Sequence, residues 1–423
     1  MKKKGLKTLL KYPDFIKLWS GNTISRLGDS IDSIAMMWMI YELTGSTIFM
    51  GTMLVCNFLP NILFGMFMGV FVDRWQKKPI MVFGDIGRGL SVAGLAILYF
   101  LGYIKPWHIY LSTFINSTIE TLVSPARMAV IPILITDKDD FLPANSLFRA
   151  SSSFGEIIGL GVAATIIGMW GIFTAIMIDC ISFFICAIII LITKIPKNRV
   201  SEVVKSVKES KVNKYINDLK IGIKTAFGHP LIRLSIFLAM ALNFFTSPFN
   251  VLAPIYSDKI LAAGAKGFSL MGMGFACGMF IGSLLIGQFG EKFNFRTLII
   301  TGIFIMTVCF NAYFFAQELY TALSISFILG IGITILSSTI STLVMTYCSQ
   351  DILGRVGSVM NSLMLAAIPM GTMITGFFGE WYLPNYIFLG IGFLLIILLI
   401  FTFFNNTLVN LNGTGNNTIE STG

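Results

Sequence analysis

The chain has 423 residues, of which 55% are hydrophobic and only 12% are charged, and its mean hydropathy is +0.81. A soluble globular protein carries about 25% charged residues, so this composition excludes one and indicates a membrane protein. The net charge of +9 does not indicate a nucleic-acid partner, because the basic residues lie between apolar segments and not on a separate basic domain.

Apolar segments of membrane-spanning length recur along the whole chain. A transmembrane helix needs about 20 predominantly apolar residues. Twelve such segments are predicted, near residues 15–41, 48–72, 80–102, 107–132, 144–167, 172–193, 231–256, 268–289, 297–316, 321–346, 357–379 and 384–404. Lipid offers the backbone no hydrogen-bond partner, so each segment is expected to be a helix. The predicted fold is an all-α polytopic membrane protein.

Two motifs occur twice at nearly the same offset. Gly69, Asp73 and Arg74 return as Gly287, Glu291 and Lys292, 218 positions later (287 − 69). Asn145, Ser146 and Leu147 return as Asn361, Ser362 and Leu363, 216 positions later (361 − 145). Small and apolar residues also recur by chance, but two unrelated motifs at nearly one offset favour parallel repeats, as in many transporters.

The repeats predict two six-helix bundles and two polar regions. The N-terminal bundle spans 1–195, a cytoplasmic central loop spans 196–228, the C-terminal bundle spans 229–404, and a disordered polar tail spans 405–423. Most Lys and Arg residues lie at the amino terminus, after the second span and in the central loop. Because basic loops stay cytoplasmic, we expect a multi-pass protein of the cell membrane with both termini in the cytoplasm.

Metal or cofactor chemistry finds little support in the sequence. The six cysteines lie in or beside apolar spans without metal-like spacing, and the chain has only two histidines, His108 and His229. A phosphate-binding G-x-x-x-x-G-K-[ST] loop is absent from the sequence. We therefore predict no cofactor, no metal and no enzymatic activity. A membrane enzyme, the alternative, would need a nucleophile, base or metal clustered near one interface.

Charged residues inside the predicted spans of the amino-terminal half form polar stripes. Each costs roughly 2.5–3.5 kcal/mol at the centre of a span, so each needs a reason. At about 100° per residue, the stripe on the first span lies within about 60° of Asp29. The three stripes consist of Asn22, Ser25, Arg26, Asp29, Asp32 and Ser33; of Thr113, Asn116, Ser117, Glu120 and Ser124; and of Arg149, Ser152, Ser153 and Glu156. Asp85 and Arg88 form an i, i+3 pair on the third span, and Asp179 lies inside the sixth.

Burial favours the protonated form of a carboxyl group, whereas a neighbouring arginine favours the charged form. A carrier that changes this balance between two conformations can take up and release protons. We predict Asp29 and Glu156 as proton-coupling residues, Glu120 as a third, and Arg26 or Arg149 as counter-ions. The alternative is a packing network in which these charges only neutralise one another.

The carboxyl-terminal half has polar stripes without a charge at mid-depth, including Asn243, Ser247 and Asn250 and a serine- and threonine-rich stripe around Ser338. Such neutral and aromatic walls suit a bulky apolar ligand. The predicted substrate-cavity residues from both halves are Asn22, Trp38, Asn116, Asn243, Phe245, Asn250 and Ser338.

The motif Gly69, Asp73, Arg74, Lys77 and Lys78 resembles the signature loop between the second and third helices of the major facilitator superfamily. Further motifs resemble its drug:proton antiporter branch, which contains bacterial macrolide efflux proteins. These are Leu43-Thr44-Gly45-Ser46, Asp85 with Arg88, Ser124-Pro125-Ala126-Arg127, Ala144-Asn145-Ser146-Leu147 and Gly354-Arg355-Val356. The resemblance covers nearly the whole chain except the tail.

The resemblance implies two six-helix bundles that rock around a central site. It also implies a cytoplasmic latch formed by the signature-loop residues, by Glu291 and Lys292, and by Arg355. Asp73 is expected near the start of the eleventh span, at Gly357 and Ser358, and Glu291 near Ala144 and Asn145. A solvated loop without a partner is the alternative.

Three positions depart from the family pattern. Gln76 replaces the usual loop glycine, Asn116 aligns with the fourth-helix arginine associated with proton transfer, and the fifth helix lacks the proline of the antiporter signature. Proton coupling is therefore expected to use differently placed carboxylates.

The predicted function is proton-coupled efflux of amphipathic drugs, such as macrolide-like antibiotics, by a monomeric carrier that uses alternating access. A siderophore or lysophospholipid carrier of the same fold is the alternative within transport. A transport-dead membrane sensor is the alternative from a different class.

Overall fold

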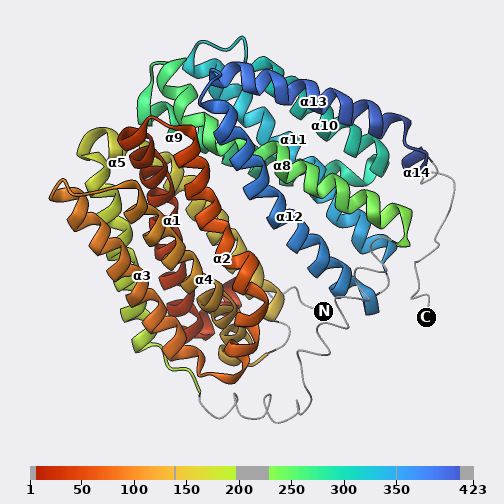
Figure 1. Cartoon of the computed structure of the whole chain (residues 1–423). Helices are drawn as coiled ribbons and strands as arrows, with labels where there is room; N and C mark the ends of the chain where they lie inside the picture. Colours follow the sequence, from red (N-terminus) through yellow and green to blue (C-terminus); the bar gives the residue numbers. More distant parts are fainter. Residues whose placement is uncertain (1–5, 138–139, 197–227, 349, 410–423) are drawn as a thin grey trace. The chain divides into compact units, whose positions relative to one another are not determined.

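The computed structural model describes residues 6–137, 140–196, 228–348 and 350–409, and nearly all of them are helical (Figure 1). In the amino-terminal half the helices are η1 (Leu6–Lys11), α1 (Pro13–Thr44), α2 (Thr47–Arg74), α3 (Lys77–Phe100), α4 (Pro106–Leu134) and α5 (Phe141–Ile192). In the carboxyl-terminal half they are α8 (Pro230–Lys259), α9 (Gly264–Phe289), η3 (Gly290–Lys292), α10 (Phe295–Ala312), α11 (Leu319–Tyr347), α12 (Gln350–Gly379), α13 (Pro384–Phe404) and α14 (Asn406–Val409). The predicted all-α polytopic fold is confirmed.

Nine helices in these described ranges are long and apolar enough to cross a membrane. α1 and α4 are not among the nine, although their 32 and 29 residues are long enough to span a bilayer. Both helices carry predicted polar stripes, which lower their hydropathy. The predicted central loop and tail lie almost wholly outside the described residues.

The fifth and sixth predicted spans are two helices that meet at Gly171, and both lie within the range labelled α5. Gly171 has φ 78° and ψ 173°, a backbone conformation that is essentially restricted to glycine. The sequence predicts two separate helices here with a break at residues 168–171. The chain makes this break with a single residue, so the two parts of α5 follow each other without a loop.

Replacing Gly171 by Ala is expected to destabilise the protein by about 1–3 kcal/mol, because a side chain at this φ and ψ is strained. Thermal unfolding of the purified protein in detergent measures the loss. Gly168→Ala is the matched control, since Gly168 lies in the helix with open space around its position. Equal stability of the two variants would contradict the assignment of strain to Gly171.

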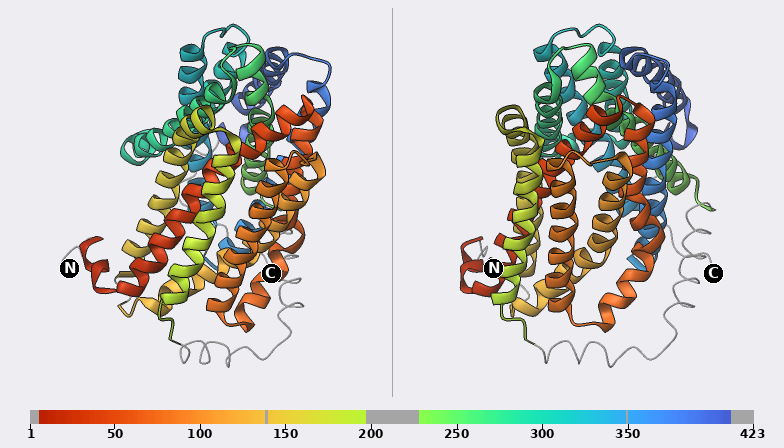
Figure 2. Two further views of the ribbon diagram at one scale, coloured as in Figure 1. Left: turned by 90° about the vertical axis from the view of Figure 1, so that its left-hand side faces the viewer. Right: turned by 60° about the vertical axis from the view of Figure 1, so that its left-hand side comes forward.

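The chain forms two compact units. Unit 1 contains α1, α3, α4, α5 and the part of α2 from Thr52 onward, and unit 2 contains α8 to α14 and the short segment Ser46–Gly51 that begins α2. In unit 1, α1 packs along α5, and α3 contacts both α4 and α5 (Figure 2). In unit 2, α11 packs on α9 and α10, and α8 packs on α12.

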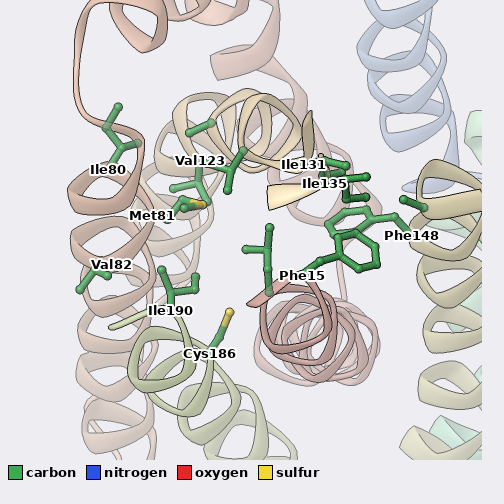
Figure 3. Close-up of a cluster of buried hydrophobic side chains, with 14 of the residues drawn as sticks. Phe15, Ile80, Met81, Val82, Val123, Ile131, Ile135, Phe148, Cys186 and Ile190 are labelled. Carbon is green, nitrogen blue, oxygen red and sulfur yellow. The ribbon is translucent and has the colours of Figure 1, made fainter. Parts of the chain in front are cut away.

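The core of unit 1 is built from one apolar face of each of its helices. Phe15 of α1, Met81 of α3, Val123 of α4 and Cys186 of α5 are all fully buried and belong to one cluster (Figure 3). Between helices in lipid, such side chains stabilise the bundle through close van der Waals packing. This cluster fixes the rotation of the four helices, and thereby decides which polar side chains meet.

The core of unit 2 includes an aromatic cluster without charges. The rings of Tyr313 and Phe388 stack with centroids 4.8 Å apart, and the Tyr256 hydroxyl donates to the carbonyl oxygen of Tyr313 at 2.8 Å. The Tyr313 hydroxyl lies 2.7 Å from Ser326 Oγ. Each buried phenol therefore has a polar partner, as buried tyrosines require.

A carboxylate at the end of α12 caps the start of α2 within unit 2. Glu380 Oε1 accepts hydrogen bonds from the Ser46 hydroxyl, from the Ile48 amide at 3.1 Å and from the Thr47 hydroxyl at 3.2 Å. The Thr47 hydroxyl also donates to the Gly376 carbonyl at 2.7 Å. The first amides of a helix lack partners within it and attract negative charge. Glu380 therefore holds the beginning of α2 against α12.

Partial burial would raise the pKa of Glu380, but the hydrogen bonds from Ser46, Ile48 and Thr47 together hold that pKa below its ordinary value. A lowered pKa stabilises the folded state above the unfolded pKa of about 4.3. This contribution is lost as the pH falls through the lower folded pKa.

Glu380→Gln is accordingly expected to lower the melting temperature at pH 7, with a difference from wild type that shrinks below about pH 4. Thermal unfolding as a function of pH measures the difference. Glu318→Gln, at an exposed acid before α11, is the control. A Glu380→Gln deficit that is the same at every pH would contradict the role of the carboxylate.

Candidate functional site

Arg88 lies at the centre of an ion-pair network inside unit 1. This arginine extends from α3, is 5% exposed, and donates to Asp29 Oδ1 on α1 at 2.7 Å and to Glu120 Oε2 on α4 at 2.9 Å. Its guanidinium also lies 4.1 Å from the centre of the Phe183 ring on α5. One buried cation thus connects four helices, through two carboxylates and one aromatic face.

Arg26 contacts the same two acids from α1. Its guanidinium donates to Glu120 Oε1 and lies 3.5 Å from Asp29 Oδ2. Asp29 and Glu120 therefore each bind both arginines. Their side chains are 22% exposed, and that of Arg26 is 32% exposed, whereas Arg88 is buried. The network of Arg26, Asp29, Arg88 and Glu120 thus has one accessible side and one buried side.

A second ion pair lies deeper in unit 1. Arg127 on α4, which is 1% exposed, donates to Oδ1 of Asp85 on α3, which is 0% exposed, at 2.6 Å. Arg127 also donates to Asn22 Oδ1 on α1 at 3.1 Å and lies 3.8 Å from Cys186 Sγ on α5. Removing one partner of such a buried pair leaves an uncompensated charge.

The structure brings together part of the predicted proton-coupling set. Arg26, Asp29 and Glu120 meet in one network, on the predicted stripes of α1 and α4. Glu156 is exposed on α5, and within the described part of the chain no hydrogen bond or ion pair to it is formed. The side chain of Arg149 lies outside what the structure describes.

The sequence prediction was wrong about the local pairing of Asp85 with Arg88. The two residues are three positions apart on α3, but Asp85 binds Arg127 and Arg88 binds Asp29 and Glu120. The reason is geometric, since the neighbouring helices present stronger partners than the next turn of α3 does. The sequence marks Arg127 only as part of a family motif, because its position opposite Asp85 depends on helix rotation, which sequence spacing does not determine.

Several polar atoms around these ion pairs are buried without a hydrogen-bond partner among the described residues. They are Asn22 Nδ2, Ser25 Oγ, Asp32 Oδ1, Asp85 Oδ2, Arg88 Nε, Asn116 Oδ1 and Arg127 Nε. Unsatisfied buried polar atoms cost free energy and are rare in packed cores.

The predicted latch residues are described only in part. Lys78 Nζ donates to the carbonyl oxygens of Leu191 at 2.7 Å and Thr193 at 2.9 Å, and thereby neutralises the negative end of α5. Lys77 is buried and donates to the Trp75 carbonyl at 3.1 Å, and Lys292 lies 5.2 Å from the centre of the Phe289 ring. The surroundings of Gly69 and the side chains of Asp73, Arg74, Glu291 and Arg355, and hence the predicted contacts of Asp73 and Glu291, lie outside what the structure describes.

The predicted cavity residues of unit 1 are partly engaged by neighbouring side chains. Asn22 accepts from Arg127, as described above, and Trp38 Nε1 donates to Glu42 Oε1 at 2.6 Å. Asn116 is partly exposed. Of the three, Asn116 is the side chain with an accessible surface and an unpaired carbonyl oxygen.

In unit 2, Asn250 is exposed and Ser338 is partly exposed. The amide of Asn243 donates to the Ala239 carbonyl at 3.0 Å. Phe245 meets Phe244 edge to face, with ring centroids 5.2 Å apart. From Pro230 to Val409, apart from the tyrosines of the aromatic cluster, every buried polar side chain that the structure describes is Ser or Thr.

Ionisable side chains buried among membrane-spanning helices are expensive, and in membrane proteins they line ion or substrate pathways. Many membrane-spanning helices in two units, one of which holds such residues, are the architecture of a secondary transporter.

Comparison with known proteins agrees with this class. The Major Facilitator Superfamily model matches residues 18–363 and 237–415, and the chain belongs to this superfamily of small-molecule transporters. Macrolide efflux protein A of Streptococcus pyogenes is 26% identical over 384 residues, which cover 90% of this chain and 93% of the relative. Macrolide efflux protein A of Enterococcus faecalis is 27% identical over 322 residues, covering 76% and 98%.

A solved structure of the nucleoside transporter NupG has the same fold. It superimposes with a TM-score of 0.75 at 13% sequence identity, and the match covers 95% of this chain and 100% of NupG. At this identity the similarity concerns the fold alone.

Asp85→Asn is expected to destabilise the protein by roughly 3–5 kcal/mol, because it leaves the buried Arg127 without its carboxylate. The double variant Asp85→Asn with Arg127→Gln removes both charges and is expected to regain part of this loss. Thermal unfolding in detergent of wild type, both single variants and the double variant measures the coupling. Purely additive effects of the two substitutions would contradict a direct ion pair.

Proposed function

We propose that this chain is a secondary active transporter that exports amphipathic compounds, macrolide-like antibiotics among them, in exchange for protons. The observation that carries the proposal is the network in which Arg26 and Arg88 share Asp29 and Glu120. It provides carboxylates whose protonation changes contacts between three helices. The two macrolide efflux relatives, each matching most of its own length, support the substrate class.

Protonation of a carboxylate in this network weakens the contacts of Arg88. A proton on Asp29 or Glu120 neutralises one of the two acids that bind Arg88, and the ion pair becomes a weaker, neutral hydrogen bond. The contact between α3 and α1 or α4 then loosens. Such a change can couple proton binding to the movement of helices in alternating access.

The remaining predicted residues complete the proposal. Glu156 is a third proton-coupling residue, with Arg26 or Arg149 as its counter-ion. The signature-loop residues around Asp73, together with Glu291, Lys292 and Arg355, act as the cytoplasmic latch. Polar and aromatic side chains at the predicted cavity positions contact the substrate. Both termini lie in the cytoplasm, and the carrier acts as a monomer.

Proteoliposomes that contain only this protein test the proposal. We expect an imposed pH gradient to drive transport of a macrolide such as erythromycin, and we expect little net transport without the gradient. Absence of flux for macrolides and other lipophilic drugs would contradict the proposal, and flux of a siderophore or a lysophospholipid instead would identify the alternative carrier. A protein without flux for any of these compounds would be the sensor.

The same assay tests the residues. Asp29→Asn and Glu120→Gln are expected to abolish transport driven by the pH gradient, because each leaves two arginines with a single acid, and Glu156→Gln is expected to reduce it. Glu318→Gln, at the exposed acid before α11, serves as the control. Unchanged gradient-driven transport in all three variants would show that these carboxylates do not couple protons.

A further inference from the structure

The charged groups buried in unit 1 do not balance one another. Three arginines, Arg26, Arg88 and Arg127, bind three acids, Asp29, Asp85 and Glu120. Two further acids of the same helices, Asp32 on α1 and Asp179 on α5, form no ion pair with any described residue. The ion pairs account for every arginine of the site whose side chain the structure describes, so among these residues the two carboxyl groups lack a cation of their own.

Asp179 is the more deeply buried of the two acids. It is 1% exposed, and its Oδ1 lies against the backbone of α1 at Gly28, where an added Cβ would come within 2.6 Å of it. Its one hydrogen bond among the described side chains comes from Ser182 Oγ at 3.4 Å. That distance exceeds the usual range of about 2.5–3.0 Å between oxygens, and the same hydroxyl donates at 2.8 Å to the Asp179 backbone carbonyl.

Asp179 lies against α1 at Gly28. Asp32 is four residues, about one helical turn, further along α1 and therefore on the same face of that helix. Its Oδ1 is buried without a hydrogen-bond partner among the described residues, while the side chain as a whole is partly exposed. Asp179 lies within electrostatic range of Asp32, Asp29 and Arg88, and Asp32 within range of Asp29 and Arg88. The one cation near the pair, Arg88, is already bound to Asp29 and Glu120.

We propose that Asp32 and Asp179 form a further proton-binding site, beside the network of Asp29 and Glu120, and hold at least one proton between them at neutral pH. Two carboxylates that share a buried environment without a cation of their own cannot both ionise at moderate cost. A proton bound by one of them removes this repulsion. Asp32, which is partly exposed, exchanges the proton with water.

On proton release, the O–H bond of the carboxylic acid breaks, the proton leaves to water, and a carboxylate remains within electrostatic range of Arg88. This new negative charge competes with Asp29 and Glu120 for the same guanidinium. Release of the proton therefore redistributes the ion pairs of α1, α3 and α4. The role of this step in transport rests on the proposed proton-driven export, whereas the proton site itself does not.

Infrared spectroscopy of the purified wild-type protein in detergent at pH 7 tests the site without any transport assay. We expect the carbonyl band of a protonated carboxylic acid, and we expect carbon-13 labelling of aspartate, but not of glutamate, to shift it. The band should disappear in Asp32→Asn with Asp179→Asn and persist in Glu318→Gln. Labelling requires no substitution, so it shows whether the protonated group is an aspartic acid even if the double variant does not fold.

Three results would overturn the assignment: no such band in the wild type, a band that shifts with labelled glutamate alone, or a band that remains in the folded double variant. Loss of the wild-type band on addition of Na⁺ at constant pH would also overturn it, because the pair would then bind a metal cation in place of a proton.

Proteoliposomes separate this inference from the proposed function. The double variant is expected to retain exchange of erythromycin across the membrane at equal pH but to lose accumulation driven by a pH gradient. Gradient-driven accumulation equal to wild type would overturn the coupling role of the pair. If the wild-type protein transports no compound, the proposed function fails, and the infrared band still decides whether Asp32 and Asp179 bind a proton.

Discussion

Arginines inside an apolar helix bundle need carboxylates beside them, and this requirement organises unit 1. Arg88 is 5% exposed and Arg127 is 1% exposed, and neither charge is tolerated at that depth unless it is paired. The partners come from α1, α3 and α4, so the rotation of each helix is fixed by charge as well as by the apolar cluster around Phe15 and Met81. Polar side chains that would be costly in isolation thus define how the bundle is assembled.

The two units satisfy their buried polar groups in different ways. Unit 1 buries charges in pairs. The buried polar side chains described in unit 2 are serines, threonines and the tyrosines of the aromatic cluster. The serine and threonine hydroxyls donate largely to carbonyl oxygens of their own helices. Hydroxyl groups of this kind do not change charge at any pH in the physiological range. The buried acids of unit 1 can therefore bind and release protons, while the buried side chains described in unit 2 are apolar, aromatic or hydroxyl groups whose charge does not change with pH in this range. This division matches a carrier that couples a proton to a lipophilic compound.

The sequence predicted the helices and the faces of the polar stripes because both follow from strong local rules. Lipid enforces helices on apolar segments, and the stripe of Asn22, Arg26 and Asp29 follows from the helical period. The pairing of Asp85 with Arg127 and of Arg88 with Glu120 was not predictable, since it depends on the rotation and depth of three helices at once. Glu380 was also missed: it lies 332 positions from Ile48, and a single acid at a helix end carries no sequence signal of its partner.

Proton release on substrate binding is the sharpest test of whether the buried acids of unit 1 are coupled to the transported compound. A macrolide is added to the purified protein in a weakly buffered detergent solution, and the pH change is followed with an indicator dye across pH 6 to 8. If the buried acids of unit 1 are coupled to the substrate, macrolide binding lowers the number of protons that they hold, and protons appear in solution with saturation matching the binding curve. Saturable binding of the macrolide with no proton release or uptake at any pH in this range would show that these acids and the substrate are not coupled.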